Sequence, residues 1–390
     1  MHIFFSAGEP SGDQHAAHLI EELRRRRPDL RVSGFGGPLM DHAGCHLLYP
    51  LTTLAVMGIF QVLPLIWTFY KLVKQAEAYL ERHKPDVVVL VDFPGFNWWI
   101  ARKAKAAGIP VVYYLPPQLW AWAPWRIKKI HRYVDLVLSG LTFETEWYAQ
   151  RGVKVQYVGH PFFDEIAQRS PDQAFIREWS SPQQPVVALL PGSRRQEVIR
   201  NWPLLLAAAR RLSAKHPHVQ FVVANYKESQ RQFCRELYER SGETLPLNFF
   251  VGKTPEIISL AKCAIMVSGS VSLEFLASGT PATVVYSVGR LTYLIGRSLM
   301  TCKSATLPNL IAGRQIFPEH LCVSNPQLAV ETMTADIDRW LSDDHAWQQT
   351  RQELLTLRNQ IFQTGASGRV AAILLDRYET AKAAHMSQAA

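Results

Sequence analysis

The sequence predicts an α/β protein made of two doubly wound, parallel-sheet domains, and three observations lead to this prediction. Short apolar runs alternate with helical patterns, as they do in βαβ units. The alternation starts a second time near Pro185, after a stretch that lacks a strong apolar pattern. The chain of 390 residues is also long enough for two domains.

In the first half of the chain, apolar runs predict strands and the segments between them predict helices. The expected strands are Ile3–Ser6, Arg31–Phe35, Val87–Val91, Val111–Leu115, Leu136–Ser139 and Val155–Val158. The expected helices include Gln14–Arg26 and Trp98–Ala107. Since the run from Val87 is apolar at every position, it is typical of a parallel strand buried on both faces.

The second half repeats the pattern and then becomes helical. The expected strands are Pro185–Leu190, Val219–Ala224, Phe249–Val251, Ala264–Val267 and Ala282–Tyr286, and the expected helices are Gln327–Leu341, Ala346–Phe362 and Arg369–Ala384. We therefore place one domain at 1–165 and a second at 166–345, with the linker within Pro161–Gln184. The helices of 346–390 are expected to pack back on the first domain.

The composition indicates a folded, basic protein from a reducing compartment. With 48% hydrophobic and 19% charged residues, the chain is not a disordered one. The net charge of +9 favours phosphorylated substrates, anionic lipid or nucleic acid, although a generic basic surface is the alternative. The five cysteines contain no CxxC pair, so neither a zinc site nor a disulfide framework is expected. The N-terminus lacks the features of a signal peptide.

The segment Met57–Val73 is apolar nearly all round but is interrupted by Pro64 and is short for a membrane span. Two alternatives stay open. It is either a buried core helix or an exposed patch that enters a membrane surface, with Ile59, Leu63, Ile66, Trp67 and Tyr70 as its apolar face. The tryptophans of Trp98–Trp99 and Trp120–Trp125 suit an interface or a core equally well.

Asp92 is the candidate general base. It follows the apolar run Val87–Val91 directly, and Pro94 and Gly95 then break the chain. Ligands of open α/β sheets bind at the carboxyl ends of the strands, so a lone carboxylate at this position is suited to accept a proton.

Two loops of the second half predict a nucleotide pocket. Gly192, Ser193 and Arg194 follow a strand and open a helix, an arrangement that binds anions such as a diphosphate. Ser268, Gly269 and Ser270 follow another strand, and Glu274 lies one turn further on, where it can accept two ribose hydroxyls. Plain βα loops with a capping serine and a helix-dipole carboxylate are the alternatives.

The turn Ser6–Asp13 is built from small residues, so a ligand can approach its backbone closely. It is not a GxGxxG fingerprint. His160, in Gly159-His160-Pro161, is a further polar candidate, for which a structural role is the simpler interpretation.

The chain resembles the lipid-A-disaccharide synthase family. The residues that carry the resemblance run in order along nearly the whole chain. They are Ala7-Gly8-Glu9 with Ser11-Gly12-Asp13, Ala55-Val56-Met57-Gly58, Asp92 and Pro94 with Phe96-Asn97, Trp120-Ala121-Trp122, Phe143-Glu144, Gly159-His160, Leu189 to Arg194, Ser268-Gly269 with Leu273-Glu274, and Leu307 to Leu310 with Ala312-Gly313.

The resemblance implies an inverting glycosyltransferase of GT-B type, with two Rossmann-like domains facing a central cleft. It implies UDP-2,3-diacylglucosamine as donor, 2,3-diacylglucosamine 1-phosphate as acceptor, and a β-1,6-linked disaccharide 1-phosphate and UDP as products. Asp92 and Arg194 fall on the family's essential residues. Asn309 falls near the nucleotide, and Met57–Val73 falls on the membrane-facing patch.

We therefore expect Asp92 to take the proton of the acceptor 6-hydroxyl, while Arg194 and the helix N-terminus stabilise the departing UDP. The residues expected to line the acceptor and donor-sugar cleft are Gly8, Glu9, Ser11, Gly12, Asp13, Asn97, Trp122 and His160. Neither a metal nor another cofactor is expected, and no nucleic acid. The enzyme is expected as a peripheral protein on the cytoplasmic face of the inner membrane, and a homodimer is left open.

The sequence departs from the family pattern at Gly95, Pro116, Gln118, Ala123 and Ser287. Most of these positions belong to the half that reads the acceptor. Two alternatives to the synthase stay open. One is another GT-B enzyme such as a UDP-sugar epimerase. The other is a non-catalytic relative that binds nucleotide or lipid, for which the departures at Gly95, Ala123 and Ser287 are the motivation.

Overall fold

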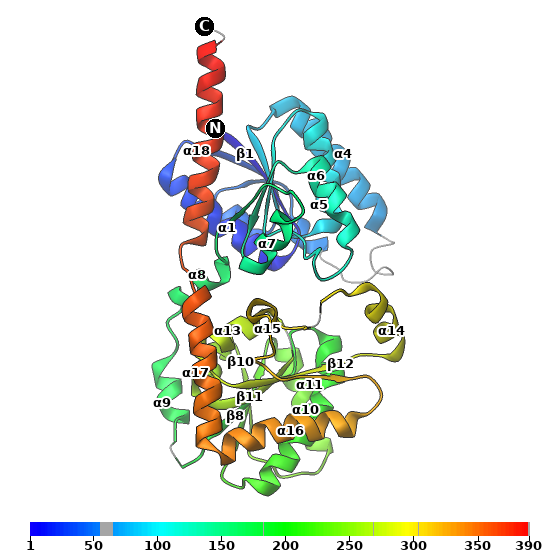
Figure 1. The fold of residues 1–390 in the computed structure, drawn as a ribbon, viewed down its shortest axis with the longest axis vertical. Helices are drawn as coiled ribbons and strands as arrows, with labels where there is room; N and C mark the ends of the chain where they lie inside the picture. The colour runs from blue at the N-terminus through cyan, green and yellow to red at the C-terminus, as the bar shows by residue number, and fades with distance from the viewer. Residues whose placement is uncertain (55–64, 182, 268, 303, 389–390) are drawn as a thin grey trace. The chain divides into compact units, whose positions relative to one another are not determined.

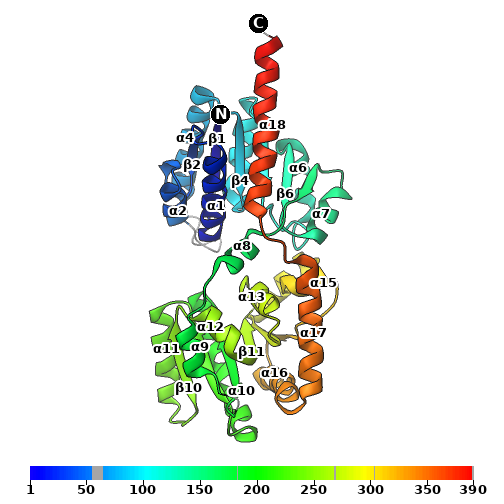
Figure 2. The same cartoon turned by 90° about the vertical axis from the view of Figure 1, so that its left-hand side faces the viewer.

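The computed structural model describes residues 1–54, 65–181, 183–267, 269–302 and 304–388 (Figures 1 and 2). They form two compact units. The first contains Met1–Ala167 and Gln363–Ala390, and the second contains Gln168–Phe362. The chain thus leaves the first unit once and returns to it for its last segment.

The first unit is built on a seven-stranded parallel sheet with the strand order β3-β2-β1-β4-β5-β6-β7. The strands are β1 (His2–Ala7), β2 (Arg31–Phe35), β3 (His46–Tyr49), β4 (Val87–Val91), β5 (Val111–Tyr114), β6 (Leu136–Ser139) and β7 (Val155–Tyr157). The strand order reverses between β1 and β4. This switch point is where doubly wound sheets bind their ligands.

Helices cover both faces of this sheet (Figure 2). The helices of this unit are α1 (Pro10–Arg26), α2 (Pro38–His42), η1 (Leu51–Leu54), α4 (Ile66–His83), α5 (Pro94–Ala106), η3 (Pro124–Arg126), α6 (Ile127–Tyr133), α7 (Thr142–Ala149), α8 (Pro161–Gln168) and α18 (Ala366–Gln388). One face packs on α1 and α18, the other on α4 and α5. Val89 of β4 points into the first core and Val88 into the second, which explains why this strand is apolar throughout.

The second unit contains a six-stranded parallel sheet in the order β10-β9-β8-β11-β12-β13. Its strands are β8 (Val186–Leu190), β9 (Gln220–Asn225), β10 (Leu247–Val251), β11 (Ala261–Val267), β12 (Ala282–Ser287) and β13 (Glu319–Cys322). Its helices are α9 (Gln173–Trp179), α10 (Arg195–Lys215), α11 (Glu228–Arg240), α12 (Thr254–Leu260), α13 (Val271–Ser278), α14 (Arg290–Leu299), α15 (Leu307–Ala312), α16 (Pro326–Ser342) and α17 (Asp344–Ile361). The switch point lies between β8 and β11.

The predicted class, two parallel-sheet α/β domains, is confirmed. The elements that were not predicted include the edge strands β3 and β13, and the short helices α8 and α9 within the expected linker. The segment 346–390 is divided between the units, because α17 packs on α13 and α16 of the second unit while α18 packs on α1 of the first. Among the described residues, no helix is long and apolar enough to cross a membrane.

Candidate functional site

Asp92 lies at the switch point of the first sheet, in a strained backbone that the surroundings hold in place. Both Asp92 and Phe93 have φ of 45°, a left-handed conformation that costs a non-glycine residue about 1–3 kcal/mol. The Asp92 carbonyl accepts hydrogen bonds from Asn97 Nδ2 and from the Tyr113 hydroxyl, each at 2.7 Å. The strain therefore sets the position of the carboxylate at the end of β4.

Asn97 ties together the ends of the two central strands. Its side chain is fully buried, and Oδ1 accepts from the Ser6 hydroxyl at 2.6 Å. Its Nδ2 donates to the carbonyls of Ser6, Val91 and Asp92. These contacts give Asn97 a role in positioning Asp92, whereas the sequence placed it in the sugar cleft.

Burial raises the pKa of Asp92, against the opposing effects of the Phe93 backbone N–H and of His15. A carboxylate with a raised pKa is a stronger base than an exposed one, which suits proton abstraction. His15 is itself buried, with Nδ1 3.1 Å from Glu165 Oε1. Neither His15 nor Glu165 was predicted from the sequence. Each is an ionisable residue at a buried position of its helix, His15 in α1 and Glu165 in α8, and this is the signal that could have identified them.

The glycines of the first loop have different roles. A Cβ on Gly8 would lie 2.1 Å from the Phe93 ring, so glycine lets this ring cover the end of β1. A Cβ on Gly12 would meet the Val91 carbonyl oxygen at 3.6 Å, an ordinary contact. Glu9 is half-buried and Ser11 is exposed at the start of α1. The Ser11 side chain is therefore accessible to a ligand.

Asp13 and His160 are engaged within the protein. Asp13 is buried, and its carboxylate accepts from the backbone N–H groups of Gly37, Leu39 and Met40, where α2 begins. Burial and the nearby His15 lower the pKa of His160 to about 3, so its ring is neutral at neutral pH. Its Nδ1 accepts from the Phe162 N–H at 3.2 Å.

The loop before α6 presents Trp122. This side chain is 41% exposed, and the Arg126 guanidinium lies 4.4 Å from the centre of its ring. Trp120 is buried instead and donates from Nε1 to Glu144 at 2.9 Å, while the Ser139 hydroxyl donates to the other Glu144 oxygen at 2.6 Å. Glu144 thus anchors the Trp-Ala-Trp loop to the end of β6.

The Gly-Ser-Arg loop lies at the switch point of the second sheet, between β8 and α10. Gly192 has φ of +117°, a left-handed conformation that favours glycine. Arg194 is the N-cap of α10, and its guanidinium donates to Glu197 Oε1 at 2.8 Å. The backbone N–H groups of Ser193 and Arg194 both donate to Glu197 Oε2 at 3.1 Å. The sequence analysis did not single out Glu197.

Glu274 and Arg169 form an ion pair in the same unit. Glu274 lies one turn into α13, as predicted, and its Oε2 accepts from Arg169 Nη1 at 2.6 Å. Gly269 and Ser270 are exposed, and a Cβ on Gly269 would meet no atom within 4 Å, so a ligand can approach there. Ser268 lies outside the described residues. Arg169, which has no motif around it, was not predicted.

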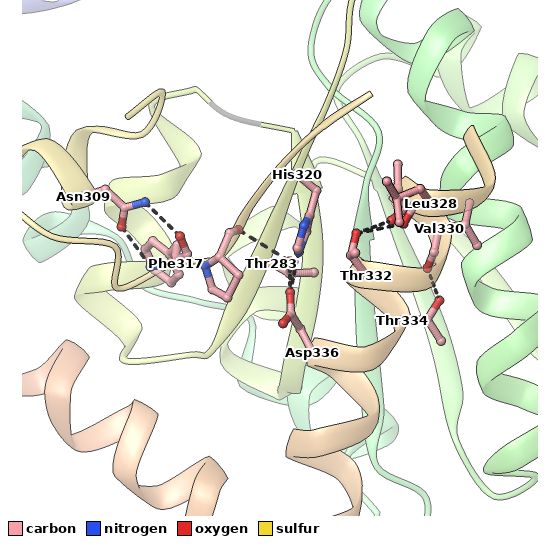
Figure 3. A network of polar contacts seen from close by, with 11 residues as sticks. Thr283, Asn309, Phe317, His320, Leu328, Val330, Thr332, Thr334 and Asp336 are labelled. Atoms are coloured by element: carbon pink, nitrogen blue, oxygen red, sulfur yellow. Dashed lines mark hydrogen bonds and ion pairs between the residues drawn. The ribbon is translucent and has the colours of Figure 1, made fainter. Parts of the chain in front are cut away.

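Asn309 locks a loop from inside (Figure 3). It is buried, and its Oδ1 accepts from the N–H groups of Ile316 and Phe317. Its Nδ2 donates to the Phe317 carbonyl at 2.8 Å and to Glu319 at 2.7 Å. Nearby, Asp336 joins Thr283 and His320. The amide of Asn309 therefore fixes the segment that leads into β13, and its place near the nucleotide stays a prediction.

The described part of the apolar segment is exposed at the start of α4. The exposed fractions of Ile66, Trp67 and Tyr70 are 50%, 74% and 54%. The opposite face of α4 is buried. These three residues therefore do not belong to a core helix that is buried on all sides. Ile59, Leu63 and the Ala55–Gly58 motif lie outside the described residues.

Two of the departures from the family pattern, Gly95 and Ser287, have little effect on packing. A Cβ on Gly95 would meet no atom within 4 Å, so this position tolerates a side chain. The Ser287 N–H donates to Asn201 Oδ1 through its backbone, a bond that any residue except proline would make.

Comparisons with known proteins give a consistent result along the whole chain. The model of the family described as lipid-A-disaccharide synthetase matches residues 3–367. A lipid-A-disaccharide synthase from Myxococcus xanthus is 39% identical, covering 96% of this chain and 97% of the relative. One from Nitrosococcus oceani is 34% identical, covering 91% of both chains.

Solved structures with the same fold are more distant in sequence. A putative UDP-N-acetylglucosamine 2-epimerase from Listeria monocytogenes matches with a TM-score of 0.65 and 11% identity, covering 97% of this chain and 96% of that one. The calicheamicin glycosyltransferase CalG4 matches with a TM-score of 0.62 and 15% identity, covering 97% of each. At these identities the likeness shows the fold alone, and it confirms the predicted GT-B type.

Proposed function

The chain belongs to the lipid-A-disaccharide synthetase family, and we propose that Asp92 and Arg194 carry the reaction of this glycosyltransferase. As an enzyme of this family it joins a UDP-activated sugar to a lipid acceptor. The finer assignment that we propose is UDP-2,3-diacylglucosamine as donor and 2,3-diacylglucosamine 1-phosphate as acceptor. The products are then the β-1,6-linked disaccharide 1-phosphate and UDP.

Asp92 acts as the general base in this proposal. Its carboxylate accepts the proton of the acceptor 6-hydroxyl, whose oxygen attacks the anomeric carbon and inverts it. The observation that supports this role most strongly is the strained, half-buried position of Asp92 at the end of β4, held by Asn97 and Tyr113. Its raised pKa adds proton affinity. A base of this kind contributes roughly 10²–10⁴-fold in rate.

The second unit binds the nucleotide in this proposal. Ser193, Arg194 and the start of α10 hold the diphosphate, and the Arg194 guanidinium stabilises the charge on departing UDP. Gly269 and Ser270 allow the nucleotide to approach, and Glu274 accepts the ribose hydroxyls. An epimerase, the rival drawn from the sequence, is supported by fold likeness alone.

The membrane surface is the proposed site of action, because both substrates carry acyl chains. Ile66, Trp67 and Tyr70 supply an exposed apolar face, and Lys71 is exposed beside them. A basic residue near an anionic surface contributes about 1 kcal/mol. We place the enzyme on the cytoplasmic face of the inner membrane, as a peripheral protein.

Turnover of the Asp92→Asn variant tests the assignment. UDP release is measured with and without diacylglucosamine 1-phosphate, and UDP affinity is measured by calorimetry. We expect acceptor-dependent release to fall by roughly 10²–10⁴-fold, with UDP affinity nearly unchanged. Near wild-type turnover would remove Asp92 from the mechanism. UDP release by the wild type without acceptor would favour a different reaction.

A further inference from the structure

The loop after β8 already holds a carboxylate where its donors would hold a phosphate. Oε2 of Glu197 accepts from the backbone N–H groups of Ser193 and Arg194, both at 3.1 Å, and Oε1 accepts from Arg194 Nη1 at 2.8 Å. Two adjacent N–H groups at a helix start, together with a guanidinium, are the donors that recognise phosphoryl oxygens. Glu197 therefore uses the donors that a diphosphate requires.

The geometry around the carboxylate fits this replacement closely. A Cβ on Gly192 would lie 2.7 Å from the Glu197 Cβ and 2.9 Å from its Oε2, so glycine is what lets the carboxylate reach the amides. The Glu197 side chain is 22% exposed, which leaves it free to move out.

The loop itself is held from behind by Gln230. Its Nε2 donates to the Ser193 carbonyl at 2.6 Å. Gln230 is 6% exposed, and its Oε1 is buried without a hydrogen-bond partner among the described residues. The bond from Gln230 holds the loop through its carbonyl side, while the N–H groups of Ser193 and Arg194 donate to Glu197.

We propose that Glu197 is an internal substitute for the nucleotide phosphate, which occupies the diphosphate position in the empty site and must leave when a nucleoside diphosphate binds. This inference rests on the proposed function, since it takes the loop to be the diphosphate site. The exchange keeps Arg194 and the two N–H groups paired with an anion at every stage. It also makes Glu197 a competitor of UDP, so that its return favours release of the product.

The Glu197→Gln variant tests the proposal because glutamine retains the capping interaction and removes the charge. Glutamine serves as well as glutamate at this position of a capping box. UDP binding is measured by calorimetry for the wild type and the variant. Losing the charge-assisted pair with Arg194 should tighten UDP binding about tenfold, equivalent to about 1.4 kcal/mol. Uridine, which has no phosphate, should bind both proteins equally.

Glu228→Gln is the matched control. Glu228 lies in the first turn of the neighbouring helix α11 and pairs with Arg231, but it takes no N–H group of the loop. The Glu228→Gln substitution changes the net charge by the same amount as Glu197→Gln, and we expect it to leave UDP affinity unchanged.

Three outcomes would overturn the proposal, and they are distinguishable. UDP binding that is equal or weaker in Glu197→Gln makes Glu197 an ordinary cap that orients Arg194. Equal tightening of uridine and UDP would show a general effect unrelated to phosphate. Absence of UDP binding in the wild type would refute the nucleotide assignment itself, and with it the premise of the exchange.

Discussion

Glu144 is a buried carboxyl group whose pKa lies near neutrality. Burial raises its pKa to about 7, while hydrogen bonds from Ser139 and Trp120 act in the opposite direction and the charge of Asp92 adds to the rise. Because the folded protein holds this proton up to a higher pH than the unfolded chain, stability falls as pH rises from about 4.5 to about 7.

The Glu144→Gln variant should remove this dependence. Glutamine can accept from Trp120 and donate to Ser139, so the anchor of the loop is retained. The stability of the variant relative to the wild type should increase by roughly 3 kcal/mol between pH 4.5 and pH 8, as a pKa difference of this size requires. Urea unfolding at several pH values measures it. Glu146→Gln, at an exposed position of the same helix, is the control. If the free energy of unfolding depended on pH in the same way for Glu144→Gln and the wild type, this would contradict a raised pKa of Glu144.

Residue type alone could not tell a ligand-binding side chain from one that binds the backbone. Asp13, Asn97 and Asn309 are small polar residues next to glycine or proline turns, which is the pattern of a binding loop. All three are buried and donate to or accept from the protein's own backbone. The positions of Asp92 and Arg194 were predictable, since each follows an apolar strand. The partners Glu197 and Arg169 were not, because they depend on side-chain directions.

At the scale of single elements, the two loops of the second unit should contribute to UDP binding separately. Arg194→Ala and Glu274→Ala should each weaken UDP binding by about 1.5–3 kcal/mol, the loss of a charge-assisted hydrogen bond. Arg231→Ala, on α11 of the same unit, controls for the loss of a surface arginine. Calorimetry provides the measurement. Unchanged affinity in both variants would place the nucleotide elsewhere.

The exposed start of α4 is the proposed contact with a membrane surface. Changing Ile66, Trp67 and Tyr70 together to serine should release it from vesicles with anionic lipid, because these side chains are at least half exposed and supply the apolar contact. Co-sedimentation measures binding, and thermal unfolding should stay cooperative. Leu328 and Tyr226 are exposed apolar residues of the other unit, and their serine variants are the control. Unfolding of the triple variant would show that these residues belong to the core.

Strands were predicted well in both sheets because buried parallel strands are apolar at every position. The edge strands β3 and β13 escaped prediction because their polar residues, His46 in β3 and Glu319 and His320 in β13, shorten the apolar run. The edge strands β7 and β10 begin with an apolar residue and were predicted. The helices α8 and α9 are short and lie in a polar stretch, so their apolar residues formed no visible period.

At the scale of the whole molecule, the separate cores predict two unfolding transitions. Leu374 of α18 is fully buried in the core of the first unit, and Leu205 of α10 in that of the second. Leu374→Ala should lower the free energy of unfolding of the first unit alone, by about 2–5 kcal/mol. Leu205→Ala should lower that of the second unit alone by a similar amount. In calorimetry, UDP should raise the transition that Leu205→Ala lowers. A single transition that responds to both changes and to UDP would show one cooperative unit.

The return of α18 to the first unit has a consequence for synthesis on the ribosome. Val370, Ala371, Leu374 and Tyr378 complete a core whose other buried members lie before Ala167, yet the about 195 residues of the second unit are made in between. At about 5–20 residues per second, this interval lasts roughly 10–40 s. Throughout it, the apolar surface of α1 and the sheet beneath lacks its cover in the nascent chain. The second unit can thus finish folding before the first, and the first unit is the natural client of chaperones that bind exposed apolar surface.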